Sequence, residues 1–111
     1  MTDELIAMSA REAVRRLRAR EGSPLDLIDA AADRIAAVDG AVNALPTLCL
    51  DRARDAAKRF VTPDDAGPGW LAGLPLAVKD LNDVAGVRTT YGSPIFADFV
   101  PDRNEVSVDT L

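Results

Sequence analysis

A short apolar run that ends in a lysine constrains the fold of this chain more than any other feature. Residues 74–78 read Leu-Pro-Leu-Ala-Val, and Lys79 and Asp80 follow them directly. A continuous apolar run of this length, bounded by a glycine and by a polar loop, is typical of a fully buried strand. We therefore predict a strand at 74–78 that presents Lys79 at its end.

The setting of Lys79 suggests a chemical role for its amine. Burial against aliphatic side chains disfavours the charged ammonium form of a lysine, and a neutral amine is a usable general base. A lysine at a strand end is also commonly solvated or ion-paired, and Asp80 is the adjacent charge. The residues alone leave both interpretations open.

Two helices are expected near the start of the chain. Ser9 and Glu12 have the spacing of a capping box, and an apolar stripe follows them until Gly22 ends the helix. The Ser-Pro pair at 23–24 supplies a cap and a first-turn proline for the next helix, whose stripe ends near 39–40. Each helix has one apolar face, which needs a partner to cover it.

The rest of the chain alternates between regular segments and turns. Residues 41–50 are expected to be extended, as an edge or irregular strand because of their proline, and 51–60 to form a third helix. The clearest loop is 63–69, which is rich in proline, aspartate and glycine. Irregular structure is expected through Pro101, and Asn104 is expected to cap a final helix.

Composition excludes several classes of protein. The net charge is −5, from 13 Lys and Arg against 18 Asp and Glu, and the two signs are interleaved, so no basic nucleic-acid-binding face is predicted. No apolar run approaches the ~18 residues of a membrane span, and the N-terminus lacks a signal-peptide layout. Cys49 is the single cysteine, so no internal disulfide can form and a cytoplasmic location is expected.

Several catalytic arrangements are also excluded. The chain has no histidine, which removes Ser-His-Asp and Cys-His catalysis. Ser93 lacks the second glycine of a nucleophile elbow, and no Gly-Lys-Ser/Thr follows the glycines of 67–69. The aspartate pairs Asp64–Asp65 and Asp80 with Asp83 are more typical of turns than of metal ligands. We expect no metal site.

The sequence resembles the amidase signature family. The specific part of the resemblance consists of Gly73–Asp80, Asp83–Gly86, Thr89–Thr90 and Gly92–Ser93. The helical segments 23–28 and 34–44 are similar to the start of the same family, so the resemblance covers essentially the whole chain. Pro46 and Asn104 are minor departures from the family pattern.

The resemblance implies an α/β fold with a mixed central β-sheet flanked by helices, of which this segment supplies two to three leading helices. Residues 1–111 would be the N-terminal segment of a single, incomplete domain. Lys79 would be the base of a Ser-cisSer-Lys triad, and the site-supporting residues would be Asp80, Thr89, Thr90, Gly92 and Ser93. The family's two catalytic serines and its oxyanion hole would lie downstream of Leu111.

The implied activity of the full-length enzyme is hydrolysis of a carboxamide to an acid and ammonia or an amine. No metal and no organic cofactor are implied, and the present chain is expected to be inactive alone. The expected partner is a small-molecule amide substrate. No direct contact with nucleic acid or membrane is expected, and a homodimer is the oligomer expected of the full-length enzyme. Two alternatives stay open: a segment of the A-type component of a glutamine-dependent tRNA amidotransferase, and a non-catalytic helical interaction module derived from a truncated amidase.

Overall fold

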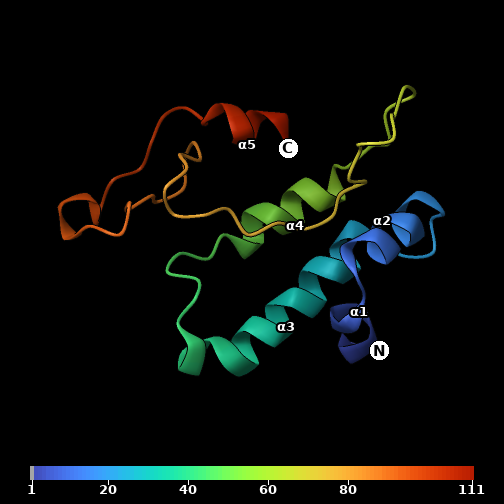
Figure 1. The fold of residues 1–111 in the computed structure, drawn as a ribbon, viewed down its shortest axis with the longest axis horizontal. Helices are drawn as coiled ribbons and strands as arrows, with labels where there is room; N and C mark the ends of the chain where they lie inside the picture. Colours follow the sequence, from blue (N-terminus) through green and yellow to red (C-terminus); the bar gives the residue numbers. More distant parts are fainter. Residues whose placement is uncertain (1) are drawn as a thin grey trace. The chain divides into compact units, whose positions relative to one another are not determined.

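A computed structural model describes the backbone of residues 2–111 and the side chains from residue 3 onward. In chain order the elements are the α-helices α1 (Thr2–Ala7), α2 (Ala10–Arg18), α3 (Pro24–Val42) and α4 (Leu50–Lys58), the 3₁₀ helix η1 (Pro94–Phe96) and α5 (Val106–Thr110) (Figure 1). The chain divides into two compact units. The helical unit runs to Ala44 and includes Leu50–Pro75, and the loop unit consists of Leu45–Cys49 and Leu76–Leu111.

The predicted mixed central sheet is wrong, because residues 2–111 contain no β-strand and only one isolated antiparallel bridge, between Val84 and Val87. The run 74–78 has no regular structure, and its Leu76 and Val78 are 50% and 39% exposed instead of buried. A strand persists only where a neighbouring strand pairs with its backbone groups. No backbone hydrogen bond joins residues 75–78 to any other described segment, so the apolar pattern alone does not make a strand.

The predicted extended segment at 41–50 is wrong for a different reason. Helix α3 continues past Gly40 to Val42, and the chain then turns at Asn43, whose φ is 54°. The Asn43 N–H donates to the carbonyl of Asp39 at 2.6 Å, which closes the helix end. Asparagine tolerates this left-handed conformation better than most residues with a side chain, so Asn43 rather than the Asp39–Gly40 pair ends the helix.

The helix starts agree with prediction. The Oγ of Ser9 accepts a hydrogen bond from the N–H of Glu12 at 3.2 Å, so Ser9 caps α2. At the start of α3 the capping box is complete: Asp26 N–H donates to Ser23 Oγ at 3.2 Å, and Ser23 N–H donates to Asp26 Oδ2 at 2.9 Å. Pro24 occupies the first turn, where its missing N–H costs nothing.

The end of α2 is a Schellman motif that does not use the predicted glycine. Arg20 adopts a φ of 58°, and its N–H donates to the carbonyl of Leu17 at 3.1 Å. The N–H of Glu21 donates to the carbonyl of Arg16 at 2.9 Å. Gly22 lies beyond the turn, and the prediction that it ends the helix is therefore wrong.

The helical unit has a small core. Helix α3 packs against both α1 and α4 (Figure 1). The buried apolar residues are mostly alanines and are Ala13, Ile28, Ala30, Ala32 and Ala72. Because alanine removes little surface from water, each of these contacts contributes little hydrophobic free energy.

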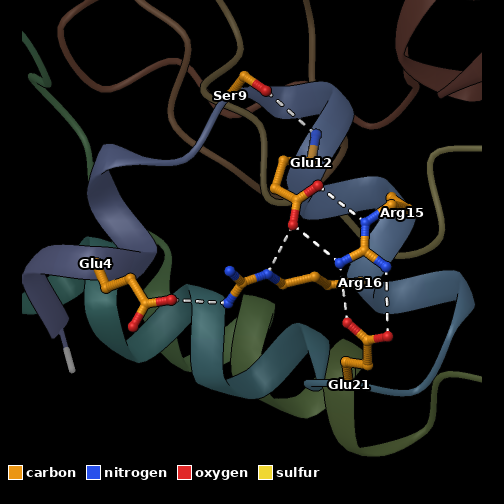
Figure 2. A network of polar contacts seen from close by, with 6 residues as sticks. All are labelled: Glu4, Ser9, Glu12, Arg15, Arg16 and Glu21. Atoms are coloured by element: carbon orange, nitrogen blue, oxygen red, sulfur yellow. Dashed lines mark hydrogen bonds and ion pairs between the residues drawn. The ribbon is translucent and has the colours of Figure 1, made fainter.

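A network of charged side chains joins α1 to α2 (Figure 2). Arg16 pairs with Glu4 of α1 at 3.0 Å and with Glu12 at 2.9 Å, and Arg15 pairs with Glu12 and Glu21, both at 2.9 Å. Hydrogen bonds from Arg15 and then from Arg16 lower the pKa of Glu12 to about 2. The Glu12 N–H donates to the cap residue Ser9, whereas its carboxylate binds Arg15 and Arg16, so the capping box predicted at Ser9 is not completed.

The loop 63–69 has no regular structure, as predicted, and α2 holds its end. Arg18 donates to the carbonyls of Gly67 and Trp70 at 2.6 and 2.8 Å, and its guanidinium lies 5.4 Å from the centre of the Trp70 ring. The ring of Phe60 stacks on Trp70 with their centres 5.8 Å apart. Gly73 follows with a φ of 86°, and a Cβ there would lie 2.5 Å from Cγ of Pro24.

Candidate functional site

Lys79 lies in the loop unit, and its side chain is exposed. Among the ion pairs of the described residues none involves Lys79. Its carbonyl accepts a hydrogen bond from the N–H of Asn82 at 2.9 Å, which begins a turn. The residues of this chain therefore do not supply the desolvated environment that the buried-strand pattern predicted for the amine.

The carboxylate of Asp80 is directed to Thr90 and makes no ion pair with Lys79. The Thr90 N–H donates to Asp80 Oδ1 at 2.8 Å, and the Thr90 hydroxyl donates to Asp80 Oδ2. These bonds, the hydroxyl first, lower the pKa of Asp80 below its ordinary value. The backbone adds a third link, from Tyr91 N–H to the Asp80 carbonyl at 2.9 Å.

The remaining site-supporting candidates meet at Thr90. Thr89 and Thr90 are 2% and 6% exposed, and they are the only buried polar residues in the part of the chain that the structure describes. Gly92, with a φ of 70°, donates its N–H to the Thr90 Oγ1 at 3.2 Å. Ser93 donates its N–H to the Thr90 carbonyl at 2.9 Å, and its own Oγ caps η1. The structure thus joins Asp80, Gly92 and Ser93 through one threonine.

Thr89 connects this cluster to the rest of the loop unit. Its hydroxyl donates to the carbonyl of Val87 at 3.1 Å, and its N–H donates to the carbonyl of Phe99 at 3.0 Å. The Gly86 N–H donates to the carbonyl of Pro101 at 2.9 Å. Segments 86–89 and 99–101 are therefore held together by single backbone bonds instead of a continuous ladder.

Sequence reasoning missed the contacts by which four residues hold this loop, which are Asp83, Arg88, Tyr91 and Asn104. Asn104 is expected from the sequence to cap the last helix, but the N-cap of α5 is Glu105, and it makes no side-chain cap bond. The Oδ1 of Asn104 instead accepts the N–H of Ala85 at 2.7 Å. Asp83 accepts a hydrogen bond from the Tyr91 hydroxyl, and its carbonyl accepts the N–H of Glu105 at 3.0 Å.

Arg88 and Tyr91 complete the set. Arg88 donates to the Oγ1 of Thr47 at 3.0 Å and to the carbonyl of Ala97, which links 45–49 to the rest of the loop unit. The ring of Tyr91 lies with its centre 5.0 and 6.0 Å from those of Phe96 and Phe99. No local sequence signal marks these contacts, because the partners lie several to many positions apart in the chain.

The chemistry available in the described residues is that of amines, hydroxyls and carboxylates. No three His, Cys, Asp or Glu side chains among residues 3–111 lie close enough together to hold a metal ion. Cys49 is a free, exposed thiol. No helix among residues 2–111 has the length and apolar character that crossing a bilayer would require.

Comparison with known proteins identifies the family. The model of the Amidase family matches residues 26–111, a range that includes Lys79 and the whole Asp80–Ser93 loop. The chain is therefore a member of the amidase family, as the motif around Lys79 predicted. No solved structure matches the chain.

Three curated relatives carry the name of the A subunit of glutamyl-tRNA(Gln) amidotransferase. The chain is 36% identical to the protein of Carboxydothermus hydrogenoformans, with 97% of this chain and 23% of the relative covered. It is 40% identical to that of Salinispora tropica, with 100% and 23% covered, and 44% identical to that of Gluconobacter oxydans, with 84% and 18% covered. The chain thus spans about a fifth of the length of these relatives.

Proposed function

We propose that this chain supplies the general base of an amide-hydrolysing active site, with Lys79 as the base. The observation that carries the proposal is the family match, whose range 26–111 includes Lys79. By resemblance, Lys79 stands where that family has its lysine base. A lysine that accepts a proton from a serine turns that serine into a nucleophile. The exposed position of the Lys79 side chain leaves its amine accessible to such a partner.

In the proposed reaction a serine attacks the carbonyl carbon of a carboxamide. A second, bridging serine passes the proton towards Lys79, and backbone N–H groups stabilise the negative oxygen of the tetrahedral intermediate. Collapse of the intermediate releases ammonia or an amine, and water then releases the acid from the acyl-enzyme. By family resemblance both serines belong to the part of the relatives that this chain does not cover, and no metal or organic cofactor takes part.

A second candidate function is that of the A-type component of a tRNA-dependent amidotransferase. It is favoured by relatives that carry the name of the A subunit of glutamyl-tRNA(Gln) amidotransferase. In that role the full-length protein would hydrolyse the amide of a donor such as glutamine. It would then be expected to act together with protein partners and a tRNA. The expectation of no direct nucleic-acid contact stays a prediction, and so does the cytoplasmic location that the single free Cys49 suggests.

The chain offers a matched pair of variants to test the proposal, because Lys58 and Lys79 are its two lysines. Lys58 is exposed on α4 and makes a loose ion pair with Asp55 at 3.9 Å. In the full-length protein, Lys79→Ala should lower the rate of ammonia release from glutamine or a simple amide by about 10²–10⁴-fold. Lys58→Ala should leave that rate unchanged.

Two results would overturn the proposal. One is a Lys79→Ala protein that hydrolyses amides as fast as the Lys58→Ala protein. The other is a stop codon directly after the codon for Leu111, because the product would then lack the family's serine pair. An open frame that runs into a glycine- and serine-rich segment would support the proposal. Preference for glutamine over simple amides would favour the amidotransferase role.

A further inference from the structure

The loop between Asp80 and Thr90 is closed by side-chain and backbone hydrogen bonds. Both carboxylate oxygens of Asp80 accept from Thr90, one from its N–H at 2.8 Å and the other from its hydroxyl. The same hydroxyl oxygen accepts the N–H of Gly92 at 3.2 Å. Thr90 is 6% exposed, so water competes little for these bonds.

The two sides of Lys79 differ in how they are held. On the N-terminal side, residues 75–78 make no backbone hydrogen bond with another described segment. On the C-terminal side, the Lys79 carbonyl is held by Asn82, and Asp80 is held through its side chain and through its carbonyl. Within this chain, the Lys79 backbone is therefore held by Asn82 directly and by Thr90 through Asp80.

We propose that Asp80 and Thr90 form a clamp that positions Lys79 for proton transfer, with Asp80 as a positioning residue and not as an acid or base. This inference rests on the proposed role of Lys79. Because each Asp80 oxygen accepts a hydrogen bond from Thr90, the carboxylate is directed to Thr90 and not to Lys79. Proton transfer requires the two heavy atoms to approach within hydrogen-bond distance, so a small displacement of the lysine slows the reaction steeply.

Thr90 provides the cleanest test, because valine and serine each keep part of its structure. In the full-length protein, Thr90→Val keeps the shape but loses the hydroxyl that binds Asp80 and Gly92. It should lower kcat by about 10–100-fold with KM nearly unchanged. Thr90→Ser keeps the hydroxyl and should retain the kcat of the unaltered protein. The kcat of Asp80→Ala should match that of Thr90→Val. The double variant should be no slower than either, because both changes remove the same hydrogen bond.

Tyr91→Phe is the matched control for lost stability. It removes a hydroxyl–carboxylate bond of the same kind in the same unit, to Asp83, without touching the clamp. We expect a lower melting temperature for Tyr91→Phe and an unchanged kcat. Equal losses of kcat in Tyr91→Phe and Thr90→Val would show a general loss of stability and would overturn the clamp, as would a Thr90→Ser protein as slow as Thr90→Val.

Failure of the clamp and failure of the proposed function give different results. An inactive Lys79→Ala protein with a fully active Thr90→Val protein would leave the function standing and overturn the positioning role. A fully active Lys79→Ala protein would overturn the function and the positioning role together. Amide hydrogen exchange tests the clamp without an activity assay. The Thr90 N–H should exchange faster in Asp80→Ala than in the unaltered protein, and its exchange rate should not change in Tyr91→Phe.

Discussion

The contacts inside the helical unit differ in kind from the contacts inside the loop unit. In the helical unit the bonds are mostly local: caps at Ser9 and Ser23, a Schellman turn at Arg20, and charged pairs one turn apart. In the loop unit a few polar side chains bind partners 8 to 41 positions away, as Tyr91 with Asp83 and Arg88 with Thr47 do. The unit carrying Lys79 therefore depends on side-chain hydrogen bonds and isolated backbone bonds more than on regular secondary structure.

The largest effect should follow from adding one methyl group at Gly73 in the helical unit. Gly73→Ala forces a side chain into a backbone with φ of 86° and places its Cβ 2.5 Å from Pro24 Cγ. We expect a loss of about 2–4 kcal/mol in the free energy of unfolding. Urea unfolding monitored by the fluorescence of Trp70, the single tryptophan, measures it.

Gly69→Ala is the control, because a Cβ at Gly69 would meet no atom within 4 Å. Its unfolding midpoint should stay close to that of the unaltered chain. If Gly73→Ala were equally harmless, the close approach of Gly73 to Pro24 would not contribute to the stability of the helical unit.

A smaller loss of stability is expected when either helix cap of the helical unit is removed, and the loss should differ between the two caps. Ser23 takes part in a reciprocal pair of bonds with Asp26, whereas Ser9 only accepts one bond from Glu12. Ser23→Ala should therefore cost about 1 kcal/mol, and Ser9→Ala less. Thermal unfolding followed by helical circular dichroism compares the two variants. A larger loss for Ser9→Ala would contradict the assignment of the complete capping box to α3.

The smallest effect is a pH dependence confined to the loop unit. The hydrogen bond to Asp83 raises the pKa of Tyr91 above its ordinary value of 10.0, because it favours the protonated phenol. The stability that this bond contributes is therefore fully present below the ordinary pKa and is lost as pH rises through the raised one. Tyr91 is the single tyrosine, so phenolate absorbance follows its titration directly.

Asp83→Ala should bring the titration of Tyr91 back towards its ordinary range. Trp70 fluorescence should not change over the same pH interval if the effect belongs to the loop unit alone. A Tyr91 that titrates identically in both proteins would show that its hydroxyl does not bind Asp83 in solution.

The parts that sequence reasoning predicted well are those with local causes. The caps at Ser9 and Ser23 and the helix now seen as Leu50–Lys58 follow from residues within one turn of each other. Lys79 was singled out by its motif, and the family match over 26–111 includes it. The strand at 74–78 failed because a strand needs a partner, and an apolar pattern carries no information about whether one is present.

The residues alone predict where α2 and α3 begin, which family the chain resembles and which lysine is the candidate base. The helix starts depend on side chains that are neighbours along the backbone, so spacing is enough to predict them. The family and the candidate base follow from the resemblance of the motif around Lys79. The folded structure is needed to show that Asp80 binds Thr90 and not Lys79, and that Asn104 binds Ala85 and does not cap α5. An aspartate or asparagine in a loop has many partners within reach, and the path of the folded chain selects one of them.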